Sequence, residues 1–242
     1  MVREMITRFG REGFGFLWLI GEPLLFCGGV LILWSILKPP YEHGVRLGPF
    51  VMTGYMCLLL MRHQVSYTQG AVRANTGILY HRRIQVVHLL LSRCYLEFLG
   101  STAAFAVVYL TLGALGQVGA PHNLILLLSG WVLVSFVASG VGFVLAGLSA
   151  RWEIIERITP VLTYALIPVS GAFFMTAWLP PHVRELYLIL PFAHGIEMVR
   201  SGVFGEFVET HYNALYALAI GLCLNVVGLL LMADARDRID DH

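Results

Sequence analysis

The feature that most constrains this chain is a series of long segments that contain no Asp, Glu, Lys or Arg. Four of them exceed the roughly 20 residues that a helix needs to cross a bilayer, and they are 98–121, 123–150, 158–181 and 212–233. A fifth segment, 13–37, contains only Glu22, and a sixth, 47–61, is long enough if it continues through Arg62 to about Tyr67. An arginine near a helix end can extend its charged head to the interface. The sequence therefore predicts an all-α membrane protein with six transmembrane helices.

The composition agrees with this prediction and removes several classes of function. Hydrophobic residues make up 57% of the chain and charged residues only 13%, about half of the one in four that soluble domains carry. Lys38 is the only lysine, so the chain has no Gly-x-x-x-x-Gly-Lys loop for binding ATP. A formal net charge of +1 gives no overall field that would attract nucleic acid. Cysteines and histidines lack metal-ligand spacing, so we expect no metal, no cofactor and no catalytic residue.

Basic residues are divided unequally between the two sides of the predicted spans. An even number of spans puts both termini on one side, and the side richer in Lys and Arg is the cytoplasmic one. One side carries twelve of them: Arg3, Arg8, Arg11, Arg62, Arg73, Arg82, Arg83, Arg93, Arg151, Arg157, Arg236 and Arg238. The other side carries four: Lys38, Arg46, Arg184 and Arg200. We therefore expect both termini in the cytoplasm.

Residues 1–12 are amphipathic and lack the apolar region and cleavage site of a signal peptide. Val2, Met5, Ile6 and Phe9 recur at helical spacing, with charged residues on the opposite face. This pattern predicts an interfacial helix on the membrane surface. The alternative is an orientation signal that only leads into the first span.

The segment 182–209 is too short and too interrupted to cross the membrane. Residues 186–196 are apolar but contain Pro191, and charged residues and glycines follow. Segments of this kind enter the membrane and return on the same side where protein or an aqueous cavity surrounds them. We expect extracytoplasmic re-entrant helices between spans five and six, with Gly202 and Gly205 permitting a sharp return. The alternative is a surface loop that carries an amphipathic helix.

Charged residues within the first and third predicted spans are candidates for function. Glu22 precedes Pro23, so a carboxylate and a helix kink coincide. An intramembrane carboxylate suggests function by default, although a shallow Glu22 could instead satisfy the backbone or a nearby arginine. Arg93 and Glu97 lie one turn apart where the third span begins, and this spacing favours a local ion pair over a proton relay.

Three polar residues of the expected re-entrant segment, His194, Glu197 and Arg200, lie at helical spacing. His194 lies one turn before Glu197, and two ligands do not make a metal site. We interpret them as a hydrogen-bonded structural pair.

The connection 68–87 between spans two and three is the largest basic loop on the cytoplasmic side. It contains apolar Ile78 and Leu79 between polar residues. These could form a short helix that docks on another protein, although a solvated loop that sets the topology explains the arginines equally well.

Three blocks of sequence resemble the ABC-2 type permeases, and among them the inner-membrane subunit of capsular polysaccharide exporters, which is similar to the O-antigen and teichoic acid permeases. The first block is Arg8-Phe9-Gly10, Phe14-Gly15-Phe16-Leu17-Trp18 and Glu22-Pro23. The second is Asn75-Thr76-Gly77-Ile78-Leu79 with Arg93 and Glu97. The third is Leu190-Pro191-Phe192-Ala193-His194 with Glu197, Arg200 and Gly205.

This resemblance implies one ABC-2 type transmembrane domain over residues 1–242 in the bacterial inner membrane. It implies a homodimeric pore, two separate ATPase subunits that hold ATP and Mg, and export of a lipid-linked capsular polysaccharide, with periplasmic and outer-membrane export proteins as further partners. Residues implied for coupling to the ATPase are Asn75, Ile78, Leu79, Arg82 and Arg83. Residues expected along the substrate path are Trp18, Glu22, Tyr55 and Arg93. Residues expected in the re-entrant segment are Pro191, His194, Glu197 and Arg200.

Two other classes of function remain as alternatives. A membrane-embedded, lipid-modifying enzyme would need a cluster of acid, base or metal-binding groups near one interface, and only His194, Glu197 and Arg200 resemble one. A secondary transporter or channel would favour mid-membrane charges or paired broken helices, which only Glu22 with Pro23 provides.

Overall fold

The computed structural model describes residues 14–74 and 86–240 of the chain. Its elements are α2 (Phe14–Leu37), β1 (Tyr41–Glu42), β2 (Val45–Arg46), α3 (Leu47–Ala74), α5 (Val86–Ala114), α6 (Leu124–Arg151), α7 (Glu153–Ala165), η1 (Thr176–Trp178), α8 (Pro181–Tyr187), α9 (Pro191–Phe204), η2 (Gly205–Phe207) and α10 (Ala214–Asp240). The expected interfacial helix, at 1–12, lies outside the described residues. So do all five residues implied for coupling: Asn75, Ile78, Leu79, Arg82 and Arg83.

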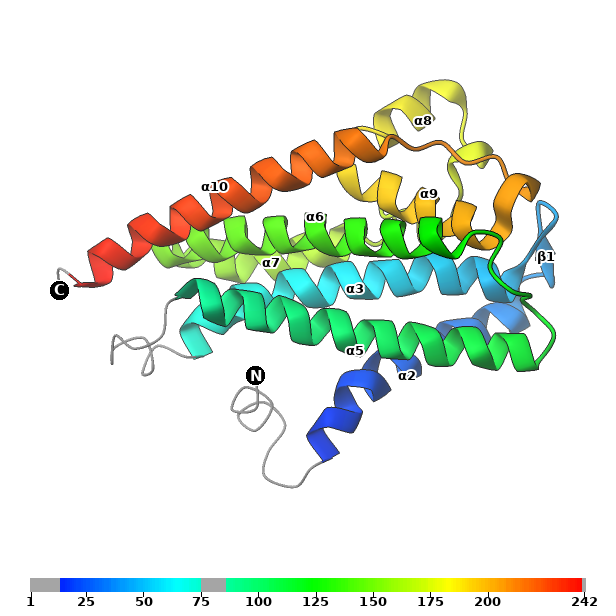
Figure 1. Ribbon diagram of the computed structural model, residues 1–242, viewed down its shortest axis with the longest axis horizontal. Coiled ribbons are helices and arrows are strands. Elements are labelled where there is room, and N and C mark those ends of the chain that lie inside the picture. Colours follow the sequence, from blue (N-terminus) through cyan, green and yellow to red (C-terminus); the bar gives the residue numbers. More distant parts are fainter. Residues whose placement is uncertain (1–13, 75–85, 241–242) are drawn as a thin grey trace.

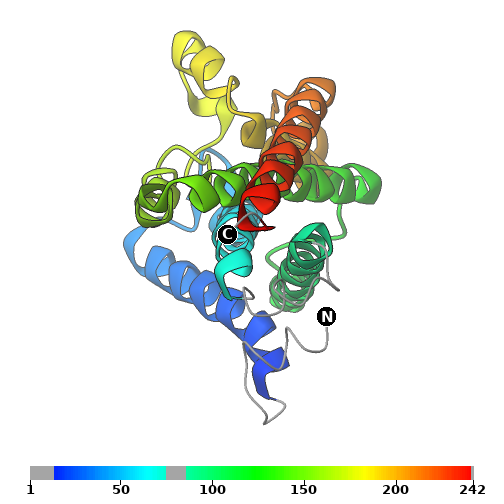
Figure 2. The same ribbon diagram turned by 90° about the vertical axis from the view of Figure 1, so that its left-hand side faces the viewer.

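The long helices run alongside one another (Figure 1). One end of the bundle carries the β1–β2 hairpin, the α5–α6 connection and the end of α9, and we call it the hairpin end. The opposite end carries the end of α3, the start of α5 and the C-terminus of the chain. Figure 2 looks from that opposite end and shows α3 near the centre of the bundle.

Four helices in the described part of the chain are long and apolar enough to cross a membrane. Their candidate spans are Ile20–Leu37, Val86–Ala114, Leu124–Arg151 and Ala214–Ala233. The prediction of a helical membrane protein is therefore confirmed. These helices match four of the six expected spans, although the helix for the third begins at Val86 and includes the charged residues that the sequence placed at its start.

The central helix α3 is more polar than the other long helices because it is enclosed by protein. It packs against α2, α5, α6, α7 and α9, and every residue from 50 to 61 is buried. Thr53, Gln64, Thr68 and Gln69 are buried on the same helix. A helix surrounded by other helices does not contact lipid over most of its surface, so neighbouring helices can satisfy its polar groups.

The fifth expected span, 158–181, is not one continuous helix. Helix α7 has 13 residues and ends at Ala165, and turns follow before η1. Pro168 explains the end of the helix, because its ring would clash with the carbonyl one turn earlier and it has no N–H to donate. Gly171 has a φ of +75° in this connection. The backbone at Ala172 lies so close to α3 that a Cβ on Gly54 would be 2.4 Å from the Ala172 oxygen.

Helix α9 packs closely along α6 because glycines lie at their contact. A Cβ on Gly130 of α6 would lie 2.7 Å from the Val199 nitrogen of α9, and one on Gly202 would lie 2.4 Å from the Leu127 nitrogen. Gly202 is therefore needed for helix packing. The sequence had suggested a role in the sharp return of the chain, and that suggestion was wrong for Gly202. The return of the chain occurs at Gly205, whose φ of +64° and ψ of −144° fall in a region open essentially only to glycine.

The two-stranded hairpin was not expected from the sequence. Tyr41 pairs with Arg46, and Glu42 pairs with Val45. His43 and Gly44 form the two-residue turn with φ values of +49° and +82°, and positive φ at both positions is the requirement of a tight hairpin turn. Strands of two residues produce no alternating pattern that a sequence reading could detect.

Candidate functional site

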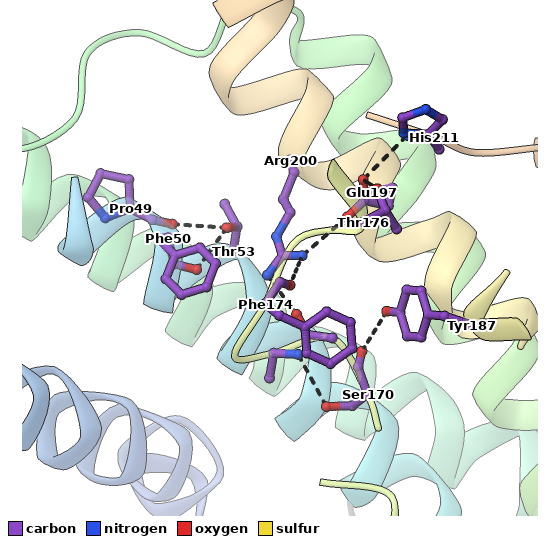
Figure 3. Close-up of polar contacts among 12 residues, drawn as sticks. Pro49, Phe50, Thr53, Ser170, Phe174, Thr176, Tyr187, Glu197, Arg200 and His211 are labelled. Atoms are coloured by element: carbon purple, nitrogen blue, oxygen red, sulfur yellow. Dashed lines mark hydrogen bonds and ion pairs between the residues drawn. The ribbon is translucent and has the colours of Figure 1, made fainter. Parts of the chain in front are cut away.

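Glu197 and Arg200 on α9 form an ion pair that is fully buried. Arg200 Nη1 lies 3.2 Å from Glu197 Oε1, and both side chains have an exposed fraction of 0%. The guanidinium also donates from Nη1 to the Phe174 carbonyl and from Nη2 to the Gly171 carbonyl, each at 2.7 Å (Figure 3). These carbonyls belong to the irregular connection after α7, which needs hydrogen-bond partners inside the protein. Arg200 therefore ties α9 to that connection.

The second carboxylate oxygen of Glu197 is also satisfied. It accepts from the Thr176 hydroxyl of η1 and, at 3.4 Å, from the backbone N–H of His211 (Figure 3). Hydrogen bonds to the ionised form stabilise it in a buried position. Together, Glu197 and Arg200 fix α9, the connection after α7 and the chain leading to α10, and we call this pair the α9 anchor.

Tyr187 of α8 supports the same connection from outside the bundle. Its hydroxyl donates to the Ser170 carbonyl at 3.1 Å, and its ring lies edge-on to Phe174 with 5.0 Å between centroids (Figure 3). Burial raises the pKa of Tyr187, so the hydroxyl keeps its proton and remains a donor.

His194 is a structural residue, but its partners differ from the one that the sequence suggested. Its Nδ1 accepts from the Asn213 backbone N–H at 3.0 Å, and its Nε2 lies 2.8 Å from the Leu188 carbonyl. Because a backbone N–H can only donate and a carbonyl can only accept, this assigns a neutral ring with the proton on Nε2. His194 joins the start of α9 to the start of α10 and does not bond to Glu197.

Five aromatic rings extend from the hairpin end toward the middle of α3. Phe173 lies 5.1 Å from Trp34 and 6.3 Å from Tyr55, measured between ring centroids. Phe50 lies 5.0 Å from Trp178 and 6.3 Å from Trp34. We call these rings the aromatic row. Tyr55, which was expected along the substrate path, is buried at 9% exposure, while Trp34, Phe173 and Trp178 are partly exposed.

A second group of polar residues joins three helices nearer the opposite end. Glu22 of α2 accepts from the Tyr67 hydroxyl of α3 at 3.3 Å and lies 3.6 Å from His63 Nε2. His63 Nδ1 lies 4.0 Å from a carboxylate oxygen of Glu97 on α5. We call Glu22, His63, Tyr67 and Glu97 the three-helix cluster. The sequence had identified Glu22 and Glu97, but it missed the two α3 residues, whose signal was two polar rings one turn apart in an apolar segment.

The predicted second span placed Arg62 near a helix end, but the structure does not. Helix α3 continues to Ala74, which is twelve residues or about 18 Å further along the axis. The Arg62 guanidinium lies over the ring of Tyr164 on α7, 4.4 Å from its centroid. Its Nε is buried without a hydrogen-bond partner, and no carboxylate within the described residues pairs with it.

The predicted path residues do not form one group. Glu22 belongs to the three-helix cluster, and Trp18 lies one turn before it with 51% of its surface exposed. Arg93 is buried on α5 at 9% exposure, whereas Tyr55 lies in the aromatic row nearer the hairpin end. Within residues 14–74 and 86–240, no group of three His, Cys, Asp or Glu side chains could hold a metal ion.

The helical bundle, with four helices long and apolar enough to cross a membrane in its described part, defines a helical membrane protein. The chain belongs to the ABC-2 type transporter family, whose model matches residues 2–204. This family consists of transporters rather than enzymes.

Curated bacterial proteins named for polysaccharide export or polysialic acid transport are similar over nearly the whole chain. The chain is 36% identical to the capsule polysaccharide export inner-membrane protein CtrC of Neisseria meningitidis serogroup B, over 96% of this chain and 88% of that one. It is 32% identical to the capsule polysaccharide export inner-membrane protein BexB of Haemophilus influenzae, over 99% of this chain and 91% of that one. It is 24% identical to the polysialic acid transport protein KpsM of Escherichia coli, over 92% and 89%.

Proposed function

We propose that this chain is the permease subunit of an ATP-driven exporter that moves a lipid-linked capsular polysaccharide across the bacterial inner membrane. The observation that carries the proposal is the similarity, over 96% and 99% of the chain, to two proteins named for capsule polysaccharide export. Because the only lysine, Lys38, is not part of a phosphate-binding loop, ATP and Mg are bound by a separate ATPase subunit. The working assembly contains two copies of this chain and two ATPase subunits.

In this proposal the chain crosses the membrane six times and has both termini in the cytoplasm. The hairpin end faces away from the cytoplasm, which agrees with the twelve basic residues counted on the other side. Helix α7 and the connection 166–178 make the fifth crossing together. Helices α8 and α9 are the re-entrant helices, and the short length of α9, 14 residues, supports this because a full crossing needs about 20.

We further propose that the substrate passes along the face of α3 that carries Tyr55 and Arg62. An arginine without a carboxylate partner inside a membrane-spanning region is costly, and such residues mark substrate paths. Arg62 with Tyr164 offers a positive charge beside an aromatic ring, and the aromatic row continues toward the hairpin end. Aromatic faces stack on sugar rings with little directional preference, which suits a sliding polymer. The polysialic acid named for one relative is an anionic polymer that such a path would accept.

Complementation tests this function directly. A strain that lacks its own capsule export permease but retains the ATPase and the biosynthetic enzymes would receive this chain, and surface polysaccharide would be measured. We expect export to be restored by the native chain and by Arg62→Lys, and to fall about tenfold with Arg62→Gln, since a charge-assisted contact is worth roughly 1.5 kcal/mol. Full export by Arg62→Gln would refute the path, and no rescue together with no copurifying ATPase would refute the transporter.

A lipid-modifying enzyme is the second candidate function, and the geometry of the three-helix cluster bears on it. The three-helix cluster places an imidazole between two carboxylates, but the separations of 3.6 and 4.0 Å exceed hydrogen-bond length. The cluster joins three helices, and the transporter remains the proposal because the family model and the capsule export relatives support it.

A further inference from the structure

A groove of about 710 Å³ lies at the hairpin end between α2, the start of α3, the end of α5 and the hairpin. It is separate from the α9 anchor, the three-helix cluster and the path proposed along α3. Its walls include apolar Leu31, Leu112 and Leu115, and polar residues Tyr41, Arg46 and Gln117. Apolar residues on the membrane-spanning helices and polar residues at the hairpin give the groove an amphipathic lining.

The polar part of the groove carries an uncompensated positive charge. Arg46 donates from Nε to the Tyr41 hydroxyl at 3.0 Å and from Nη1 to the Gly116 carbonyl, but no carboxylate in the described chain is paired with it. The nearby Lys38 is neutralised by Glu42, at 2.9 Å between Nζ and Oε1. Arg46 is exposed, so its remaining donors are available to an anion.

The depth of the groove matches one leaflet of a bilayer. Gly28 lines its inner part, nine residues before α2 ends at Leu37, which corresponds to about 14 Å along the helix axis. Half of the hydrocarbon core is about 15 Å thick. An acyl chain that enters beside Arg46 therefore reaches Gly28 at the depth where its own leaflet ends.

We propose that this groove is a binding site for a phospholipid with an anionic headgroup, drawn from the leaflet at the hairpin end. One acyl chain lies between α2 and α5, and the headgroup phosphate accepts hydrogen bonds from Arg46. The site goes beyond the proposed export function, because it requires neither the ATPase nor the polysaccharide. A bound lipid would fill the space between α2 and α5 where protein does not.

Two adjacent glycines provide a matched pair of variants. A Cβ added to Gly28 or to Gly29 meets no atom within 4 Å, so neither substitution is expected to disturb folding by a clash. Only Gly28 lines the groove. Gly28→Leu therefore fills the groove, and Gly29→Leu adds the same side chain outside it. Arg46→Gln removes the charge, and Arg46→Lys keeps it.

The experiment is native mass spectrometry of the full-length chain, purified in detergent and titrated with phosphatidylglycerol or phosphatidylethanolamine. We expect the native chain and Gly29→Leu to bind phosphatidylglycerol about tenfold more tightly than phosphatidylethanolamine. Both headgroups carry the phosphate, but the ammonium of phosphatidylethanolamine neutralises it and is repelled by Arg46. Arg46→Gln should lose this preference while Arg46→Lys retains most of it, and Gly28→Leu should lose the bound lipid of either kind.

Four outcomes would overturn the site. Equal binding of phosphatidylglycerol by Gly28→Leu and Gly29→Leu would do so, and so would a full headgroup preference kept by Arg46→Gln. A glycolipid that copurifies in this groove and resists exchange with phosphatidylglycerol would assign it to the exported substrate instead. A dimer that dissociates only with Gly28→Leu would assign it to a second copy of the chain. None of these results would affect complementation, which tests export separately.

Discussion

Replacing Arg200 by methionine should destabilise the protein by about 3–5 kcal/mol, the cost of removing one partner from a buried ion pair. Methionine has a similar length and removes the charge. The substitution leaves Glu197, with an exposed fraction of 0%, without its counter-charge. It also takes away the donor that reaches the carbonyls of Gly171 and Phe174 (Figure 3). An unsatisfied buried polar group costs roughly 1–3 kcal/mol, so the loss should fall at the upper part of the range.

The assay is the free energy of unfolding of the purified chain, measured by reversible denaturation in mixed micelles. The control is Arg157→Met, which breaks the exposed pair with Glu153, where the side chains are 72% and 65% exposed. Pairs of this kind contribute about 0.2–0.5 kcal/mol. The double variant Glu197→Gln with Arg200→Met should be less damaging than the sum of its parts, by up to about 3 kcal/mol. If Arg200→Met costs no more than Arg157→Met, the α9 anchor is not a stabilising element.

Three further predictions concern topology, backbone strain and coupling. A cysteine at Gly119 should react with an impermeant thiol reagent in intact cells and one at Arg82 should not; labelling of Arg82 from outside would contradict the six-span topology. Gly205→Ala should lower the free energy of unfolding by about 1–3 kcal/mol because its φ and ψ are open only to glycine, while Gly119→Ala, where a Cβ meets nothing within 4 Å, should have little effect. Replacing Ile78 and Leu79 by aspartate should abolish export and copurification of the ATPase without preventing membrane insertion, and unimpaired export would reject this coupling site.

The sequence predicted the membrane class and four long helices well, because charge-free length is a direct requirement of the bilayer. It predicted helix ends less well, because a charged residue does not end a helix when protein surrounds it. Helix α5 begins twelve residues before the expected start of the third span at Phe98, and Arg93 and Glu97 are both buried within it. Their burial depends on α2 and α3, which pack on α5, and no local pattern in the sequence contains that information.

The candidate site was predicted in part for the same reason. Proline and glycine in 182–209 indicated an interrupted segment, and these are local signals that a sequence carries. The hydrogen-bond partners of Arg200 could not be predicted from the sequence. They are backbone carbonyls 26 and 29 residues away, in a connection that had been predicted as helix. His63 and Tyr67 were missed because polar rings in an apolar span are more often packing residues than part of a cluster, and their partners Glu22 and Glu97 lie on other helices.

The attachment of α2 differs in kind from that of the other long helices. Only 11% of its apolar window is buried, compared with 44% for α5 and for α6, and its first part leans away from the bundle (Figure 1). Lipid tails are as apolar as leucine, so moving an apolar face from protein to lipid changes its free energy little. Polar contacts have no such replacement in lipid. Besides the packing of Trp34 on Phe50 and Phe173, the contacts of Glu22 with Tyr67 and His63 therefore give α2 a polar attachment to α3, immediately before the break in helical hydrogen bonding at Pro23.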